Sequence, residues 1–510
     1  MTSEIALCID LGTTGIKVAA FDERLNCLGN AVVENQLRYP APGWVEQDPA
    51  HFWNSALALM RQMAARLGDD ARRVVTIVCS GQMGGSLGID ADWNAVGHFD
   101  AILDPRSNVC QVRVAPHAAA IQTIAGGLTT QLEKMLYWRA YQPEAYARIR
   151  KFLGLNGYLA GKLAGLKTEE AFTDVTFSMV SGVMNAVTGE WDDGLLGIFD
   201  LPRAKLPRVV QPQAAIGVLA PGLADELGLP RGVTILAGAG DGAATYAGAG
   251  VSQPGMALDL SGTACALGAY SAEFLPDVQQ QMFLNLKSPT APGWYLIYAN
   301  QFGRTHRWFI DTFCQDLIGA GDVGAAYAAM DLQAAALPPG AGGLFAVPHL
   351  SGRASPPKPH LRGAWLGFGL GFTRAHFYRS LLESHAAEFK MVKSRLAGLG
   401  ASLEPREVIV AGGGSRSDFW NQMKADMLGS TYRRLADSDI STLRGDAMIA
   451  AQARGWPVLE AAGEAGLQFD REYRPDEATT QCYARIIQDY EALGERLDPV
   501  MAGLPARLVE

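Results

Sequence analysis

The sequence of 510 residues carries a formal net charge of −9 and is 48% hydrophobic. The negative charge, with a pI near 5.5, argues against a general attraction to nucleic acid or to anionic membranes, so any phosphate binding must be local. The length exceeds what one hydrophobic core supports, and we therefore expect two large domains and a small-molecule partner.

The cysteines and the lengths of the apolar runs indicate in which cellular compartment the protein lies. Seven cysteines are scattered without the spacing of a metal site, which favours core thiols in a reducing environment. No uninterrupted apolar run reaches the roughly 18 residues of a transmembrane helix. The first residues contain no basic segment of the kind that opens a signal peptide. The sequence predicts a soluble cytoplasmic protein.

Strand and helix signals alternate along the first half. Residues 5–10 and 16–21 have the pattern of two buried strands on either side of a Gly-Thr-Thr turn. Asp48 and Pro49 then open a helix that Gly68 ends. Residues 74–79 predict a buried strand, which runs into a glycine-rich loop at 81–85. This alternation indicates an α/β fold.

The first turn carries the residue types that phosphate and metal chemistry need. Asp10 closes the strand, and Gly12, Thr13 and Thr14 form the turn, with Lys17 shortly after. Glycine lets backbone N–H groups approach an anion, and the hydroxyl groups add neutral donors. Taken alone, such a turn is equally typical of an ordinary hairpin.

A similar phrase recurs just past the middle of the chain. Residues 257–263 repeat an apolar strand with a carboxylate, Asp259, and end at Gly262 and Thr263. Two turns of this kind facing each other predict a site for a polyphosphate between them. The repeat also suggests that the chain divides into two related halves.

One carboxylate lies in an unusual setting at the end of the first half. The strand at 233–236 is followed by an Ala- and Gly-rich segment, residues 237–244, which contains Asp241. An unpaired charge is costly among tightly packed backbone, so Asp241 requires a functional reason. The alternative is that Asp241 caps the helix that follows.

The last motif of the second half is a glycine-rich turn. A long helix from Thr373 to about Gly398 precedes a strand at 408–411, and Gly412, Gly413, Gly414 and Ser415 follow. A helix then runs from about 418 to 428, with Gly429 at its C-terminus. A strand, glycines and a helix N-terminus in this order predict a nucleotide site.

The order of these motifs resembles the FGGY carbohydrate kinases, within the actin/hexokinase/heat-shock ATPase superfamily. The two Gly-Thr turns and residues 410–415 are similar to its phosphate and adenosine motifs, and residues 80–83 to its xylulokinase branch. The resemblance implies two RNase-H-like domains around a deep cleft. Residues 1–251 would form the sugar-binding domain and residues 252–510 the nucleotide-binding domain.

The resemblance also implies roles for individual residues, with ATP and Mg²⁺ as the cofactors. Asp241 would be the general base that accepts the proton of the sugar hydroxyl, and Asp10 would organise Mg²⁺ through bound water. The sugar contacts would be Gln82, Met83, Asp104, Arg106 and Asp241. The ATP contacts would be Gly12, Thr13, Thr14, Lys17, Gly262, Thr263, Gly412, Gly413, Gly414 and Ser415. A homodimer is the expected assembly.

Three departures from the family concern the sugar side. Gly84 stands where the xylulokinase-like segment has His, Ile102 where Trp-x-Asp-x-Arg has Trp, and Gly242 where Asn or Gln often follows the base. Losing polar groups removes discrimination, so we expect a roomier or less selective pocket. The resemblance favours D-xylulose or another ketopentose, with another polyol, a hexulose or a sugar acid as alternatives.

Two other classes of protein stay open at this point. Gly412-x-Gly414-x-x-Ser417, with Asp437 beyond, is compatible with a nicotinamide-dependent dehydrogenase, although its third position is not glycine and the two Gly-Thr turns stay unexplained. An actin- or chaperone-like ATPase would share the ATP site but would not need Asp241 or the loop at 81–85. Dependence of ATP turnover on sugar separates the kinase from the ATPase.

Overall fold

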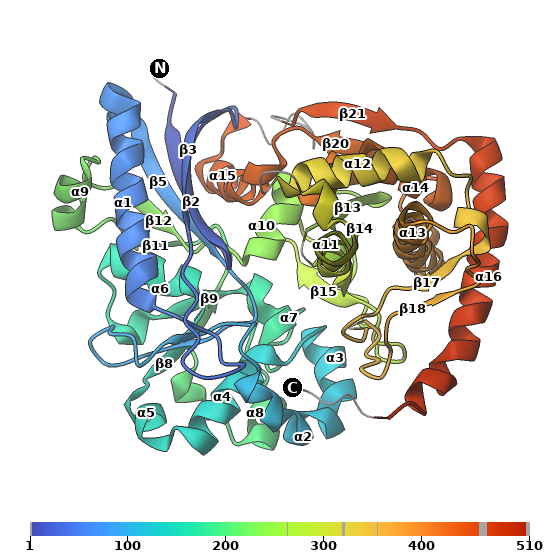
Figure 1. Ribbon diagram of the computed structural model, residues 1–510. Helices are drawn as coiled ribbons and strands as arrows, with labels where there is room; N and C mark the ends of the chain where they lie inside the picture. The colour runs from blue at the N-terminus through green and yellow to red at the C-terminus, as the bar shows by residue number, and fades with distance from the viewer. Residues whose placement is uncertain (1–2, 263, 319–321, 354, 458–466, 506–510) are drawn as a thin grey trace.

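The computed structural model describes residues 3–262, 264–318, 322–353, 355–457 and 467–505, and Figure 1 shows one sheet in each half of the chain. Thr263, one of the expected phosphate contacts, lies outside the described residues. In the described part, the first sheet has the order β11-β12-β5-β1-β2-β3 and the second the order β15-β16-β14-β13-β19-β20-β21.

The strands of the first sheet are β1 (Ile5–Leu11), β2 (Gly15–Asp22), β3 (Cys27–Glu34), β5 (Val74–Gly81), β11 (Ala215–Val218) and β12 (Thr234–Leu236). Those of the second are β13 (Met256–Ser261), β14 (Cys265–Ser271), β15 (Leu284–Lys287), β16 (Trp294–Asn300), β19 (Glu407–Ala411), β20 (Thr431–Leu435) and β21 (Phe469–Tyr473). Short two-stranded sheets pair β4 (Glu46–Gln47) with β7 (Phe99–Asp100), β6 (Leu87–Ile89) with β8 (Lys151–Leu153), β9 (Phe172–Asp174) with β10 (Arg208–Val210), and β17 (Phe345–Val347) with β18 (Ala364–Leu366).

Both large sheets are built on the same plan. In the first, β1, β2 and β3 are antiparallel neighbours, β5 is parallel to β1, and β12 is parallel to β5. In the second, β13, β14 and β16 are antiparallel, β19 is parallel to β13, and β20 is parallel to β19. The repeated phrase therefore occupies the same place in both halves, at the turn after the first strand.

The helices of the first half are α1 (Pro49–Leu67), α2 (Gln111–Val114), α3 (Ala118–Ala125), α4 (Thr130–Tyr141), α5 (Pro143–Arg148), α6 (Leu155–Ala164), α7 (Ser178–Ser181), α8 (Asp193–Phe199), α9 (Pro221–Leu227) and α10 (Asp241–Gly248). Those of the second are α11 (Phe302–Phe313), α12 (Val323–Ala335), α13 (Arg374–Leu399), α14 (Asp418–Leu428), α15 (Ser441–Arg454) and α16 (Glu477–Ala502). The predicted cap of α1 is confirmed, since the Asp48 side chain accepts from the backbone N–H of Ala50.

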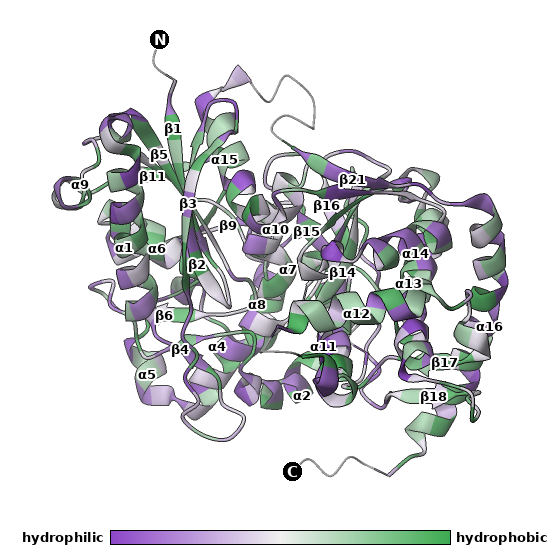
Figure 2. Ribbon diagram, turned by 45° about the horizontal axis from the view of Figure 1, so that its top comes forward, coloured by the Kyte–Doolittle hydropathy of each residue, from purple (hydrophilic) through white to green (hydrophobic). Residues whose placement is uncertain are grey.

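Strand β1 is buried along its whole length because both faces of the sheet are covered. Its alternate residues enter two different cores: Ile5, Leu7 and Ile9 pack with α1, whereas Ala6 and Cys8 pack with α10 and α15. Figure 2 shows the same contrast in colour, with β1 and β5 hydrophobic and α1 carrying both hydrophobic and hydrophilic residues.

Helices α10 and α15 join the two halves, and in Figure 1 α15 lies beside strands of the first sheet. A Cβ on Gly248 would lie 1.9 Å from the carbonyl oxygen of Ser441, and a Cβ on Gly445 would lie 1.9 Å from that of Ala244. The two helices thus meet backbone to backbone, which only glycine permits at these positions. Among the described helices, none is long and apolar enough to cross a bilayer.

Candidate active site

The first Gly-Thr turn joins β1 to β2 in a shape that requires glycine. The N–H of Gly12 donates to the carbonyl of Gly15 at 3.0 Å. A Cβ on Gly12 would lie only 2.9 Å from that same carbonyl oxygen, and 3.8 Å from the Asp10 carboxylate oxygens. Thr13 is partly buried and Thr14 is exposed at the tip of the turn. The turn therefore presents hydroxyl groups beside an acidic side chain.

Asp10 is buried at the end of β1 without a full set of partners. Its Oδ1 has no hydrogen-bond partner among the described residues. Burial raises the pKa of Asp10 to about 6, against a lowering influence from Lys17, its cross-strand neighbour on β2. Lys17 itself reaches the other half of the chain, where its Nζ donates to the carbonyl oxygen of Asp439 at 3.0 Å. A buried carboxylate oxygen left unpaired is suited to a hydrated cation.

Asp241 is the first residue of α10, directly after the N-cap residue Gly240. Asp241 is therefore not the helix cap itself, and its carboxylate accepts from the N–H of Gly242 at 2.7 Å. Burial, and then the negative charge of Asp10, raise the pKa of Asp241 to about 7, while the backbone N–H groups of Gly242 and Met83 lower it. A carboxylate with a pKa near neutral suits general base catalysis.

The loop before Asp241 is held from two sides. Gly238 has φ +71°, and a Cβ there would lie 1.9 Å from the carbonyl oxygen of Cys79 on β5. The N–H of Gly240 donates to the hydroxyl of Thr176 at 2.8 Å. That hydroxyl in turn donates to the fully buried Asp174, which also accepts from Asn156 at 3.0 Å. These contacts thus hold the backbone directly before Asp241 in place.

A pair of buried glutamines connects the loop at 81–85 with the first turn. Gln82 donates from Nε2 to Oε1 of Gln47 at 2.9 Å and accepts from the Thr13 hydroxyl at 3.3 Å. Gln47 donates to the Thr13 carbonyl oxygen at 3.3 Å. The Met83 side chain packs on Gly240 and Gly242. Gln82, Met83, Thr13 and Asp241 therefore lie in one neighbourhood.

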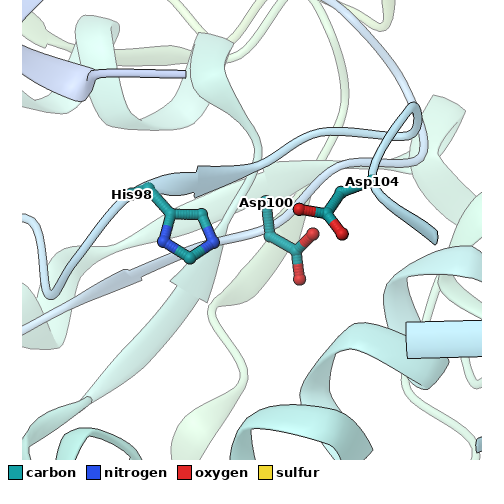
Figure 3. A group of neighbouring side chains, drawn as sticks. All are labelled: His98, Asp100 and Asp104. Atoms are coloured by element: carbon teal, nitrogen blue, oxygen red, sulfur yellow. The ribbon is translucent and has the colours of Figure 1, made fainter. Parts of the chain in front are cut away.

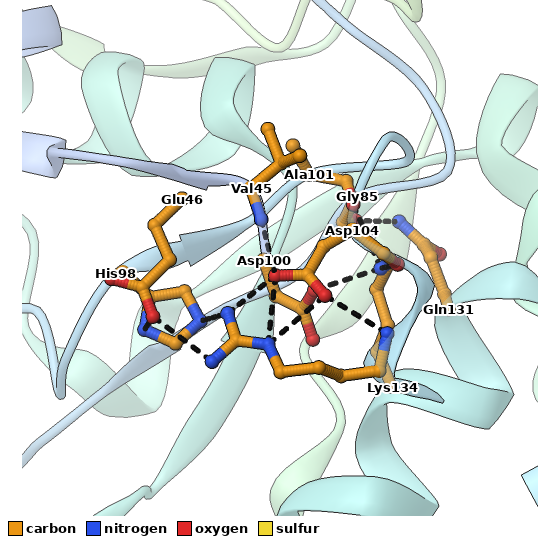
Figure 4. Close-up of polar contacts among 10 residues, drawn as sticks. Val45, Glu46, Gly85, His98, Asp100, Ala101, Asp104, Gln131 and Lys134 are labelled. Atoms are coloured by element: carbon orange, nitrogen blue, oxygen red, sulfur yellow. Dashed lines mark hydrogen bonds and ion pairs between the residues drawn. The ribbon is translucent and has the colours of Figure 1, made fainter. Parts of the chain in front are cut away.

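Asp104 and Arg106 belong to a network of charges around His98 and Asp100. Figure 3 shows His98, Asp100 and Asp104 turned toward one another, and their potential ligand atoms lie within 4.8 Å. Both carboxylates already face a cation, however. Arg106 bonds Asp104 through Nε at 2.9 Å and also contacts Glu46 at 2.9 Å, and the buried Lys134 bonds Asp100 at 2.8 Å (Figure 4).

Both carboxylates of this network already have a cationic partner among the described residues. Although burial opposes it, the hydrogen bonds from Arg106 lower the pKa of Asp104. Asp104 also accepts from the backbone N–H of Val45 at 3.3 Å, and Lys134 donates to the carbonyl oxygen of Ala101 at 2.8 Å. The side chains of Asp104 and Arg106 are thus engaged with the protein, tying the loops at 43–46 and 98–106 together.

The glycine-rich turn of the second half lines a cavity of about 640 Å³. Gly412 has φ +87°, and a Cβ there would lie 2.9 Å from the carbonyl oxygen of Ser261, so this turn rests directly on the second Gly-Thr turn. Ser415 closes the turn by donating to the Gly412 carbonyl oxygen at 2.7 Å. The residues lining the cavity include Ser261, Gly262, Gly303, Arg307, Tyr327, Asp331, Gly413, Gly414, Arg416, Ser417 and Trp420.

Comparison with known proteins identifies this arrangement. A model of the N-terminal domain of the FGGY family of carbohydrate kinases matches residues 5–248, and a model of its C-terminal domain matches residues 260–454. The chain belongs to the FGGY family of carbohydrate kinases. It is an ATP-dependent carbohydrate kinase, which confirms the predicted family and enzyme class.

Individual relatives cover nearly the whole FGGY chain. A xylulose kinase of Staphylococcus epidermidis is 26% identical over 99% of both chains, and a glycerol kinase of Acidovorax sp. is 28% identical over 97% of this chain and 99% of its own. The crystal structure of xylulose kinase from Rhodospirillum rubrum, 24% identical, superimposes with a TM-score of 0.87 over 98% of this chain and 100% of that one. The predicted α/β fold with two actin-like domains is confirmed.

Some residues of the FGGY kinase site escaped the sequence reasoning. Gln47 was not among the predicted sugar contacts, and only the structure shows that it accepts a hydrogen bond from Gln82. Asp174 and Thr176, which support Gly240, lie 64 or more residues before it and share no motif with it. Asp446, on α15, is fully buried and accepts from the Ser80 hydroxyl at 2.7 Å.

Proposed function

We propose that this kinase transfers the γ-phosphoryl group of ATP to a hydroxyl of a ketopentose, with D-xylulose as the first candidate. The observation that carries the proposal is Asp241, whose carboxylate starts α10 with a pKa of about 7, next to both Asp10 and the loop of Gln82 and Met83. The xylulose kinase relatives support the choice of sugar. The glycerol kinase relatives favour a different polyol as the second candidate.

In the proposed reaction Asp241 accepts the proton of the sugar hydroxyl as that oxygen attacks the γ-phosphorus. The α10 N-terminus and the N–H of Gly242 stabilise the charged carboxylate before transfer. Since phosphoryl transfer depends on positioning and electrostatics, the support of Gly240 by Thr176 contributes by fixing where Asp241 lies. Residues 1–251 would carry the sugar, and residues 252–510 the nucleotide.

The nucleotide would occupy the cavity lined by Gly413 and Gly414, with its phosphates directed to the Gly-Thr turns. Gly12, Gly262 and the hydroxyls of Thr13, Thr14 and Thr263 would donate to the phosphates, with Lys17 adding positive charge. Asp10, with its unpaired Oδ1, would hold Mg²⁺ through bound water. When bound, the ion neutralises negative charge on the phosphates. A homodimer is proposed from the family resemblance.

The test is sugar-dependent ADP release over pentuloses, hexuloses, polyols and sugar acids. Turnover that depends on a pentulose is expected, and Asp241→Asn should lower it about 10²–10⁴-fold, because the base is lost. Asp193→Asn is the matched control: Asp193 is also the first residue of its helix, but it is exposed. Near-normal turnover of Asp241→Asn would show that the base is misassigned.

A further inference from the structure

The cavity beside the glycine-rich turn contains one carboxylate among the described residues that line it. That carboxylate belongs to Asp331 on α12, and none of the described lysines or arginines forms an ion pair with it. Two arginines also line the cavity. Arg307 is already paired with Asp311 at 2.8 Å, and Arg416 is exposed. Asp331 thus lines the cavity as a carboxylate that has no cationic partner in the described structure.

The side chain of Asp331 is held from two neighbouring helices. The hydroxyl of Tyr378, on α13, donates to its Oδ1 at 3.3 Å, and the hydroxyl of Ser417 bonds it from the N-cap of α14. Helix α12 packs against both α13 and α14 (Figure 1). Burial raises the pKa of Asp331, and the two hydroxyl contacts oppose this rise. A carboxylate has about four acceptor sites, so two fixed partners leave sites for a ligand.

The contact with Ser417 places Asp331 close to the predicted nucleotide motif. Ser417 follows Gly414 by three residues, and both line the same cavity as Asp331. Gly262, in the second Gly-Thr turn, lines this cavity too. Because a carboxylate repels phosphate, an ATP molecule whose phosphates lie at the Gly-Thr turn would present its nucleoside to Asp331.

The chemistry of an ionised carboxylate decides which nucleoside groups it can bind. It accepts hydrogen bonds and donates none, so its partner must offer N–H or O–H groups. Adenine offers one amino group, beside a ring nitrogen that is itself an acceptor. Ribose offers two adjacent hydroxyls that can both donate, and in dinucleotide-binding folds an acidic residue accepts from the ribose 2′-hydroxyl. In ATP, the ribose is therefore the better partner for Asp331.

We propose that Asp331 accepts hydrogen bonds from the ribose hydroxyls of ATP, and that it thereby makes the kinase select ribonucleotides over 2′-deoxyribonucleotides as phosphoryl donors. The inference rests on the proposed function, which puts the nucleotide in the cavity lined by Gly413 and Gly414. Without the 2′-hydroxyl, the partly buried carboxylate loses a partner. A hydrogen bond to a charged group changes affinity by about 10- to 100-fold, which is the discrimination that we expect.

Nucleotide binding without any sugar tests the inference. Isothermal titration calorimetry would compare ADP, 2′-deoxy-ADP and GDP in the presence of Mg²⁺. We expect 2′-deoxy-ADP to bind about tenfold or more weakly than ADP. Equal affinities for these two nucleotides would overturn the inference. Tighter binding of GDP than of ADP would also overturn it, because guanine has two adjacent N–H donors and Asp331 would then contact the base.

This inference and the proposed function fail in different ways. Equal binding of ADP and 2′-deoxy-ADP, together with sugar-dependent ADP release, overturns the ribose contact alone. If ADP binds but no sugar stimulates ADP release, the sugar kinase proposal is overturned, and the ratio of the two affinities still decides the ribose contact. No binding of any nucleotide would overturn both.

The variant Asp331→Asn removes the charge at nearly constant size. The preference for ADP over 2′-deoxy-ADP should fall to about threefold or less, and the KM for ATP should rise about tenfold with little change in kcat. Asp316→Asn is the matched control, because Asp316 pairs with Arg374 at the surface and does not line the cavity. It should keep the preference of the parent.

An undiminished preference for ADP in a folded Asp331→Asn protein would refute the role of Asp331. Circular dichroism would establish that the variant is folded. If it is not, Asp331→Ser provides the same comparison, because its shorter side chain also lacks the charge. The measurement on the parent protein depends on neither variant, and equal affinities there would by themselves refute the selection of ribonucleotides.

Discussion

The two Gly-Thr turns repeat one phrase but differ in how their carboxylates are neutralised. Asp259, on β13, is fully buried and forms an ion pair with the buried Lys424 at 2.5 Å, while Ser261 donates to its other oxygen at 2.7 Å. Asp10, on β1, is also buried, yet one of its oxygens has no partner in the described structure. The two similar local sequences, which differ by the extra Ser261 before the second Gly-Thr, thus give one complete and one incomplete electrostatic site.

The difference shows how a duplicated fold can divide its tasks. A buried ion pair with its hydrogen bonds satisfied holds a turn in place and leaves no charge to attract a ligand. A buried carboxylate without a cation is unfavourable in isolation, and it gains from any cation that approaches. The Asp259 carboxylate therefore holds its turn in place beneath Gly412, and Asp10 is the carboxylate that we propose for Mg²⁺.

The largest expected effect on stability comes from removing one partner of the Asp259–Lys424 ion pair. Lys424→Met should lower the free energy of unfolding by about 3–5 kcal/mol, because it leaves the Asp259 charge buried and unpaired. Chemical denaturation measures this. The double variant Asp259→Leu with Lys424→Met should recover most of the loss, since no charge is then left in the core. A single variant as stable as the parent would mean that the pair is not needed.

The opposite result is expected at the incomplete site. Asp10→Asn should raise the free energy of unfolding at pH 7 by about 1–3 kcal/mol, since burial holds the pKa of Asp10 at about 6 and its charged form strains the folded state. It should at the same time abolish sugar-dependent ADP release. Parallel denaturation and activity assays test both parts. If Asp10→Asn lost stability as well as activity, Asp10 would be a residue that stabilises the fold, as Asp259 does.

A third carboxylate near the Asp10 turn should make stability depend on pH. Asp446 on α15 bonds Ser80, the β5 residue paired with Asp10, and burial raises its pKa well above the usual value. A raised carboxyl pKa makes the folded state bind the extra proton. Stability should therefore fall as pH rises above about 4, by up to about 1.4 kcal/mol per pH unit, until the folded-state pKa is passed.

The variant Asp446→Asn removes this titration and should reduce the slope of unfolding free energy against pH, leaving the slope that the raised pKa values of Asp10 and Asp241 produce. Denaturation at a series of pH values between 5 and 8 would measure the slope for both proteins. Asp437→Asn, at an exposed carboxylate nearby in the chain, should leave the slope unchanged. An identical slope in the parent and Asp446→Asn would show that Asp446 is ionised in the folded state, as it is in the unfolded chain, over this range.

The sequence by itself determined the local elements and the order of the motifs. The apolar run in β1 predicts a strand, Asp48 predicts a helix start, and the glycines at 12 and 412 predict tight turns. Each of these structures depends mainly on residues that are close together in the chain. The family resemblance rests on this order. These features were sufficient for the α/β fold with two domains and for the kinase class.

Only the tertiary structure decided which distant side chains meet. Lys424 neutralises Asp259 from 165 residues away, and Gln47 reaches Gln82 across two loops. Ile102 fills the space beside Gly84, where the loss of a side chain alone predicts a void. Such pairings depend on how the elements pack and not on the local sequence pattern. A buried charge needs a partner and a buried space needs a side chain to fill it, and both are supplied by residues that are distant in the sequence.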